Sequence, residues 1–220
     1  MADTSTETPR ERYRAQVRAE IKEHAWEQLA TAGASALSLN AIAKRMSMSG
    51  PALYRYFASR DELITELIRD AYRSLADTFR AAASGPDLPT PAALAHALRG
   101  WALQDPHRYF LVYGTPIPGY HAPDDVTTTV REIMATLLDA CAALPADTSA
   151  TAFQTHIQEH RQWAGDHPAE PAALHRALTF WTRLHGALSL ELAGHFTGMG
   201  FDPALLFTAE LDDLTGASTH

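Results

Sequence analysis

Hydroxyl, phenol and guanidinium side chains are concentrated in one short stretch of the chain, between Ser38 and Arg60. Proteins use these groups to contact phosphate oxygens, and a guanidinium group also reads guanine edges. Residues 37–60 contain four Lys or Arg residues and no Asp or Glu. The residue types therefore indicate a surface suited to nucleic-acid phosphates.

Two short helices are expected to position these groups. The first covers about 39–46 and the second about 50–56, with a three-residue turn between them. Ser38 and Ser49 are predicted to be their N-caps, where hydroxyl and backbone N–H groups attract phosphate. Pro51 falls in the first turn of the second helix, where its missing N–H costs little. The pattern fits a helix-turn-helix, whose second helix lies in the major groove.

The second helix starts with three small residues, Gly50, Pro51 and Ala52, so it can lie deep in a groove. Tyr54 and Tyr56 then offer phenol hydroxyls to phosphates. The neighbouring Arg55 and Arg60 supply positive charge, and Arg55 is also placed to read a guanine edge.

Longer helices are expected on both sides of this motif. Val17, Ile21, Ala25 and Leu29 recur every four residues and predict a helix over about 10–32. A capping box at 59–62 begins a helix that runs to about 83, and a Gly/Pro-rich break follows it. The predicted divisions are a disordered tail (1–9), a helix-turn-helix domain (10–60) with a linking helix (about 60–83), and a C-terminal domain (84–220).

The C-terminal domain is also predicted to be helical. No convincing alternation of apolar and polar residues indicates a strand, so the expected fold class is all-α. The expected helices cover about 91–103, 106–114, 124–143, 149–165, 170–198 and 203–214.

The string LNAIAKRMSMSGPALYRYFASRDELI resembles the DNA-binding domain of the TetR family, over roughly residues 15–75. The resemblance implies an all-helical homodimeric repressor whose three N-terminal helices bind a palindromic double-stranded operator. The family often has a basic residue where Asn40 stands. Position by position, the resemblance puts DNA-backbone contacts on Ser38, Asn40, Ser49, Tyr54, Tyr56 and Arg60, and base contacts near Gly50, Pro51, Ala52 and Arg55.

The string WTRLHGALSLEL at 181–192 is similar to a Trp/His-Gly signature of one TetR C-terminal subclass, as is the segment 109–120. The resemblance implies a ligand-binding and dimerisation domain. Many large rings in a helical bundle often leave an apolar cavity, so we expect an aromatic or hydrophobic small molecule to bind and release the DNA. The candidate pocket walls are Trp101, Tyr109, Tyr113, Phe153, Trp163, Trp181 and His185.

The helix over 170–198 is apolar on more than one face, and its small residues Gly186, Ala187 and Ser189 allow close helix packing. We expect it to pack with the last helix against their copies in a second subunit, giving a two-fold dimer that matches two half-sites. A helix in the core of a single subunit is the alternative.

Charge and composition narrow the function classes. The net charge is −8, but residues 1–60 carry +3 and the remaining 160 residues −11, so one basic end on an acidic body is expected to bind DNA. Cys141 is the only cysteine, and no apolar run approaches the length of a membrane span. Without an N-terminal signal pattern, we expect a soluble cytoplasmic protein that has no membrane partner.

The sequence fits two other classes of protein less well. A hydrolase could use Ser189, His185 and Glu191 as a catalytic triad, but these residues share one helix and no strained nucleophile turn is present. The sequence also has no Gly-rich phosphate-binding loop that would indicate a cofactor. A protein-binding adaptor needs no acid-free basic stretch. His156 and His160 have a spacing that can bind a metal, but such pairs usually lie on solvated faces, so no metal is expected.

Overall fold

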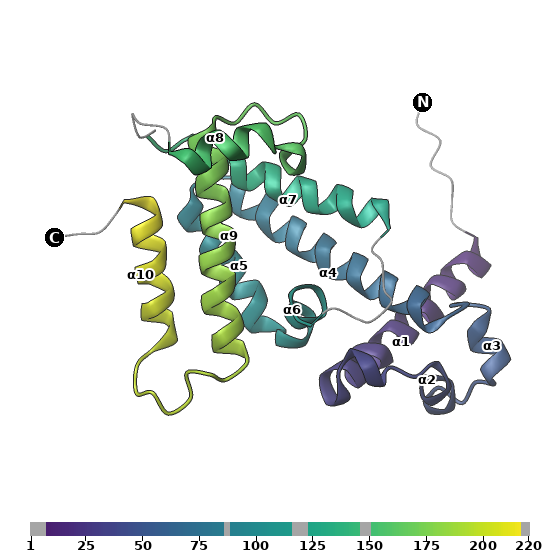
Figure 1. Ribbon diagram of the computed structural model, residues 1–220. Coiled ribbons are helices and arrows are strands. Elements are labelled where there is room, and N and C mark those ends of the chain that lie inside the picture. The colour runs from purple at the N-terminus through teal and green to yellow at the C-terminus, as the bar shows by residue number, and fades with distance from the viewer. Residues whose placement is uncertain (1–7, 86–88, 116–122, 146–150, 217–220) are drawn as a thin grey trace. The chain divides into compact units, whose positions relative to one another are not determined.

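The computed structural model describes residues 8–85, 89–115, 123–145 and 151–216, and every regular element in these ranges is a helix (Figure 1). The predicted all-α class is therefore confirmed. Among the described residues, one compact unit comprises 8–70 and another comprises 71–114 with 123–216. Helix α4, Arg60–Ala83, contributes residues to both units.

The first unit begins with α1, Pro9–Ala32, which starts in a capping box. The Glu11 amide donates to Thr8 Oγ1 at 3.3 Å, and the Thr8 amide donates to Glu11 Oε2 at 2.8 Å. Pro9 is therefore part of the first helical turn rather than of the predicted tail. Residues 1–7 lie outside the described ranges. The four apolar residues at i, i+4 spacing are buried along one face of α1, as the periodicity predicts.

Three further helices complete this unit: α2 (Leu39–Arg45), α3 (Gly50–Tyr54) and the first part of α4. A short 3-10 helix, η1 (Ala34–Ala36), precedes α2. Helix α3 has only five residues, too few to be stable alone, so its position depends on tertiary contacts. Its Leu53 and the following Phe57 provide two of them, since both side chains are fully buried.

The second unit is organised around α9, Pro171–Leu192, which packs against α5, α7, α8 and α10 (Figure 1). Proline occupies the first turn of α5, α6, α9 and α10, where its missing N–H is not needed. The remaining helices are α5 (Pro91–Gln104), α6 (Pro106–Tyr113), α7 (Asp124–Ala142), α8 (Ala152–Glu159) and α10 (Pro203–Thr215).

Two predicted helices end earlier than expected. The helix predicted over 149–165 is interrupted: α8 ends at Glu159, and a 3-10 turn, η2 (Gln162–Ala164), follows. The helix predicted over 170–198 stops at Leu192, because Gly194 adopts a left-handed backbone conformation with a φ of 78°. Gly198, further along the loop, has a φ of 83°. Glycine accepts such conformations without steric cost. The apolar periodicity of the sequence continues past Leu192, which is why it predicted a longer helix.

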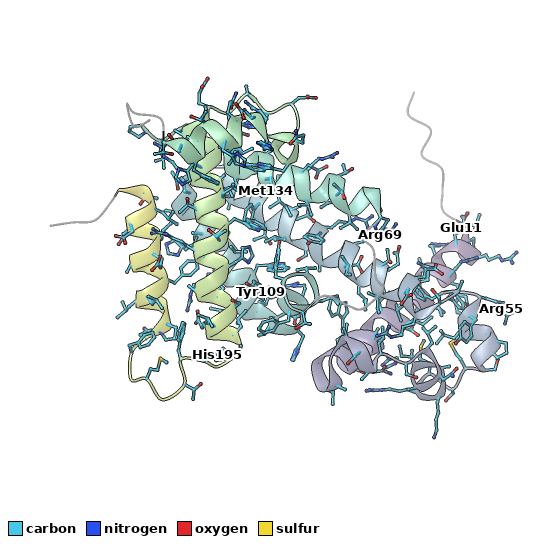
Figure 2. All side chains as sticks on the ribbon, viewed as in Figure 1. Glu11, Arg55, Arg69, Tyr109, Met134 and His195 are labelled. Carbon is cyan, nitrogen blue, oxygen red and sulfur yellow. The ribbon has the colours of Figure 1, made fainter. Side chains whose placement is uncertain are left out.

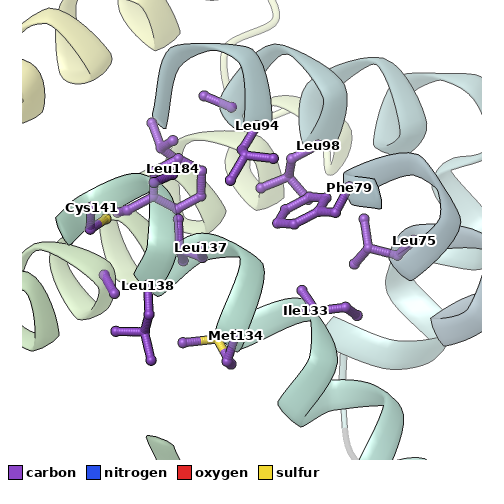
Figure 3. Packing of buried hydrophobic residues seen from close by; sticks show 14 of the residues in the cluster. Leu75, Phe79, Leu94, Leu98, Ile133, Met134, Leu137, Leu138, Cys141 and Leu184 are labelled. Carbon is purple, nitrogen blue, oxygen red and sulfur yellow. The ribbon is translucent and has the colours of Figure 1, made fainter. Parts of the chain in front are cut away.

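The core of the second unit is formed by aliphatic and aromatic side chains from several helices. Figure 3 shows Leu75 and Phe79 of α4 beside Leu98 of α5 and Ile133 of α7. All four are at most 1% exposed, which means that this part of α4 is tightly packed against the rest of its unit. Within the described ranges, no helix has the length and hydrophobicity needed to cross a bilayer.

Candidate nucleic-acid interface and ligand site

The N-terminus of α2 is fixed by Gln28 of α1. The Ser38 amide donates to Gln28 Oε1 at 2.9 Å, and Gln28 Nε2 lies 3.5 Å from the Ser38 carbonyl oxygen. Ser38 Oγ accepts from the Ala41 amide at 3.3 Å, so Ser38 is an N-cap, as predicted. Its hydroxyl is used as an acceptor there, which leaves its proton available to donate to a phosphate oxygen.

The turn between α2 and α3 is a Schellman motif with serine where glycine is favoured. The Met48 amide donates to the Ala43 carbonyl at 2.8 Å, and the Ser47 amide donates to the Lys44 carbonyl at 3.2 Å. Ser47 has a φ of 55°, and it is the only described residue other than glycine with a positive φ. A non-glycine residue in this conformation is strained, because its Cβ lies close to the neighbouring carbonyl.

The Ser49 hydroxyl at the N-terminus of α3 makes no capping hydrogen bond. Ser49 has the extended backbone of an N-cap, but the missing side-chain bond differs from our expectation. The first turn is closed instead by the Ser49 carbonyl, which accepts from the Ala52 amide at 2.9 Å. Asn40 lies against this end of α3, since a Cβ built on Gly50 would be 3.6 Å from Asn40 Oδ1. The structure thus brings Asn40, Ser49 and Gly50 together.

Two arginines of α1 hold the other end of α3. Arg14 Nη2 lies 3.4 Å from the Arg55 carbonyl oxygen, and Arg18 Nη1 donates to the Tyr56 carbonyl. These carbonyls belong to the C-cap of α3, Arg55, and to the residue after it, so they lie beside the helix end that carries a partial negative charge. Our sequence reasoning missed Arg14, Arg18 and Gln28, because their partners lie 10 to 41 residues away and no local pattern marks them.

The side chains of α3 that are not used for packing remain exposed. Pro51, Tyr54 and Arg55 are exposed, and Arg55 is labelled at the end of α3 in Figure 2. Within the described part of the chain, the Arg55 guanidinium makes no ion pair, and neither does the exposed Lys44. Both cations are therefore free to meet an external anion.

The other two basic residues of the acid-free stretch have internal partners. Arg45 Nη1 lies 2.8 Å from Glu27 Oε2. Arg60 Nη2 donates to the Ala34 carbonyl at 2.5 Å, and its Nε donates to the Leu37 carbonyl at 3.2 Å. The Arg60 guanidinium thus fixes the segment that leads into α2, a contact that its sequence position did not reveal.

The predicted pocket residues divide into one cluster and three separate sites. Tyr109 and Tyr113 of α6 lie against Trp181 and His185 of α9, with ring centroids 4.3 to 5.7 Å apart. Tyr72 of α4 contacts Tyr113 edge to face at 6.1 Å, a member that our sequence reasoning missed. We call these five residues the aromatic cluster.

The other three candidates make no described ring contact with the aromatic cluster. Trp101 is buried, and its Nε1 donates to Ser74 Oγ at 3.1 Å. Phe153 is 47% exposed on α8, and Trp163 lies partly buried in η2. The seven predicted residues therefore do not share one lining, because helical periodicity alone does not tell which rings face each other.

Burial controls the electrostatics of the aromatic cluster. It lowers the pKa of His185 to about 4, so the imidazole is neutral at pH 7. Burial also raises the pKa values of the Tyr109 and Tyr113 hydroxyls above their usual range. The Tyr109 hydroxyl lies 3.0 Å from His185 Nδ1 and 3.2 Å from the His185 carbonyl oxygen. The cluster is thus an uncharged group of rings with polar tips.

The described residues give little support for metal binding or for a reactive cysteine. His156 and His160 stack with ring centroids 4.2 Å apart on exposed positions, but the described residues contain no group of three or more potential metal ligands. Cys141 is buried, and burial raises the pKa of its thiol to about 12, which suppresses its reactivity.

The two units match two family models. Residues 21–67 match the model of bacterial regulatory proteins of the tetR family, and residues 91–214 match the tetracyclin repressor-like C-terminal domain. The chain belongs to the TetR family, and it is a helix-turn-helix transcriptional regulator rather than an enzyme.

Several proteins are similar over nearly the whole chain. An HTH-type transcriptional regulator of Mycobacterium tuberculosis (Rv1816) is 37% identical over 90% of both chains. The crystal structure of a protein described as regulatory, SCO4313, has a TM-score of 0.88, with 71% identity over 95% of this chain and 100% of that one. A TetR family regulator from Shewanella sp. PV-4 has a TM-score of 0.58 at 16% identity, covering 91% and 96% of the two chains, which shows a shared fold.

Proposed function

We propose that this protein is a repressor that binds a palindromic operator as a homodimer and leaves it when a small apolar or aromatic molecule binds. One observation carries the DNA half of this proposal. Helix α3 presents small residues at its N-terminus, while its Leu53 is buried in the core of its own unit. Arg14 and Arg18 of α1 hold the backbone that directly follows α3. A rigidly held helix with an open tip suits insertion into a major groove.

We infer different roles for the predicted DNA contacts. The hydroxyls of Ser38, Ser49, Tyr54 and Tyr56 bind phosphates, and Lys44 joins them through its unpaired ammonium group. Arg55 reads a base edge or binds a phosphate, and Gly50, Pro51 and Ala52 allow close approach of α3 to the bases. Asn40 contacts DNA next to Gly50. Arg60 acts mainly by holding Ala34 and Leu37, so it positions α2 rather than binding a phosphate directly.

Exposed apolar residues at one end of the second unit support dimerisation. Leu190 of α9 is 44% exposed and Leu205 of α10 is 70% exposed, with Met199 at 63% between them in the chain. Gly186 faces open space, since a Cβ built there would meet no atom within 4 Å. Glycine in the middle of a helix is unfavourable, and close approach of a second helix is a common reason for it. We infer that α9 and α10 pack against their copies.

Helix α6 supports the effector half of the proposal, because it contacts both the aromatic cluster and α4. Its Tyr109 and Tyr113 belong to the cluster, while Arg108 donates from Nη1 to Ser74 Oγ of α4 at 3.3 Å. Since α4 continues from Ser74 into the DNA-binding unit, a ligand that displaces α6 changes the equilibrium position of α4.

The test of the DNA half is fluorescence anisotropy with DNA from upstream of the protein's own gene, across a series of salt concentrations. Replacing Lys44 and Arg55 together by alanine should weaken binding and lower the slope of log K against log salt by about one if Arg55 reads a base edge, and by about two if it binds a phosphate, since each lost phosphate contact removes about one. The matched control is Arg131→Ala in the second unit, which should leave the slope unchanged. Equal slopes for the double variant and the wild type would contradict the proposal.

A further inference from the structure

Two polar atoms in the aromatic cluster lack partners. The Tyr113 hydroxyl oxygen and Nε2 of His185 are closed off from solvent and have no hydrogen-bond partner among the described residues. Buried polar groups are nearly always paired in folded proteins, because leaving one unpaired is costly. Two such atoms on neighbouring rings, 4.3 Å apart at their centroids, therefore call for an explanation.

The rings around these atoms form an apolar site that reaches the surface of the second unit. Tyr113 lies among Tyr72, Tyr109, Trp181 and His185, with ring centroids 4.3 to 6.1 Å from its own. Tyr113, Trp181 and His185 are each partly exposed, although the two unpaired atoms are not. A flat apolar molecule reaches these atoms only by moving one of the partly exposed rings.

The contacts of Tyr109 determine what His185 offers to a ligand. The Tyr109 hydroxyl has one proton and two nearby partners, the His185 carbonyl oxygen and Nδ1. Both contacts become hydrogen bonds if the hydroxyl donates to the carbonyl and Nδ1–H donates to the hydroxyl oxygen. That arrangement leaves Nε2 of His185 with a lone pair, so this atom accepts a hydrogen bond.

The cluster offers no charge to a ligand. None of the contacts described for Tyr113 or His185 involves Asp, Glu, Lys or Arg. A carboxylate cannot donate to Nε2, and an ammonium group would be buried without a counter-charge, which is unfavourable. A neutral hydroxyl group on an apolar molecule both donates to Nε2 and accepts from the Tyr113 O–H.

We propose that the aromatic cluster binds a neutral phenol, whose O–H donates to His185 Nε2 and whose oxygen accepts from the Tyr113 hydroxyl. The ring of the phenol packs against Trp181 and the tyrosine rings. This inference rests on the effector half of the proposed function, and it specifies the class of molecule that this site accepts.

Calorimetric titration of the 220-residue protein without DNA tests the ligand class. The probes are phenol, toluene (the same shape without a hydroxyl), anisole (an oxygen without a proton) and benzoate (an anion). Phenol should bind about tenfold more tightly than toluene or anisole, as expected for one or two neutral hydrogen bonds, and benzoate should not bind measurably. Absence of phenol binding, or equal affinities for phenol and anisole, would overturn the proposal.

Two variants assign the binding to the unpaired atoms. Tyr113→Phe should weaken phenol binding about tenfold and raise the melting temperature of the free protein, because it removes an unpaired buried hydroxyl. His185→Phe should also weaken binding, while Tyr13→Phe at an exposed hydroxyl is the control and should change neither property. Unchanged phenol affinity in both cluster variants would refute the assignment.

The release of DNA is measured separately. If phenol binds as expected but leaves the operator complex intact, the ligand class stands and the release step of the proposed function fails. If phenol does not bind, the DNA-binding half of the proposed function is unaffected.

Discussion

Arg18 of α1 donates to the Tyr56 carbonyl, and its guanidinium lies 4.1 Å from the centre of the Phe57 ring. One side chain thus binds the backbone just after α3 and also covers the buried aromatic ring of the next residue. Arg18 Nη2 also lies 3.7 Å from Glu66 of α4, so the same group connects three helices. This arrangement explains how a five-residue helix has a defined orientation.

Replacing Arg18 by alanine should therefore loosen α3 without unfolding the chain. We expect a loss of about 1–2 kcal/mol in the free energy of unfolding, from one charge-assisted hydrogen bond and one cation–π contact, and weaker DNA binding. Chemical denaturation and anisotropy measure the two effects. Arg12→Ala, an exposed position on the same helix, is the control, and equal behaviour of the two variants would contradict the role of Arg18.

Ser47→Gly should stabilise the protein by about 0.5–1 kcal/mol, because glycine accepts the left-handed conformation at the turn without strain. For a chain of this length, that corresponds to a rise in melting temperature of about 1–4 °C. Ser47→Val should have the opposite effect, since a β-branched residue is disfavoured at positive φ. A scan in which glycine destabilises and valine is neutral would rule out the strain at this position.

The stability of the second unit should fall as the pH is lowered from about 6.5 to about 4. Burial lowers the pKa of folded His185 to about 4, below its unfolded value of 6.5, so the unfolded chain binds the extra proton in this window. The loss is of the order of 3 kcal/mol at most. Denaturation at several pH values should show that His185→Phe flattens this dependence. His195→Gln, an exposed histidine on the loop after α9, should not.

Leu205→Asp should convert the proposed dimer into a monomer with little change in the fold, because this side chain is 70% exposed in the single chain. A carboxylate buried against its own copy is unfavourable. Sedimentation at micromolar concentration measures the change, and Thr155→Asp on the exposed face of α8 is a control of equal charge. A wild-type protein that sediments as a monomer would remove the basis of the dimer.

Local signals in the sequence predicted most of the helices, but they did not predict which distant residues contact each other. Ser38 and the prolines at 51, 91, 106 and 203 mark helix starts, because capping and N-terminal proline are local effects. The early end of α9 was missed, since Gly194 follows a run whose apolar periodicity continues.

In the candidate DNA and ligand sites, too, residues with a local signal were identified from the sequence and contacts between distant residues were not. The small residues at 50–52 were proposed as base contacts from their size, and that role stays a prediction. Tyr109 and His185 were both among the aromatic candidates, but their pairing was not predicted. The internal role of Arg60 and the contribution of Tyr72 were not predicted either, because a side chain's partner across 23 or 41 residues depends on the packed fold. Basic residues near a helix-turn-helix look alike in sequence whether they face DNA or a carbonyl.

The residues that hold α3 in place and the residues that it presents are separate sets. Leu53, Phe57 and Arg18 provide the anchorage, whereas Pro51 and Arg55 contribute nothing to the core. Substitutions on the presented face consequently have little effect on folding. In the proposed DNA complex, operator preference is therefore free to diverge during evolution, and a designer can exchange the presented residues while keeping the scaffold intact.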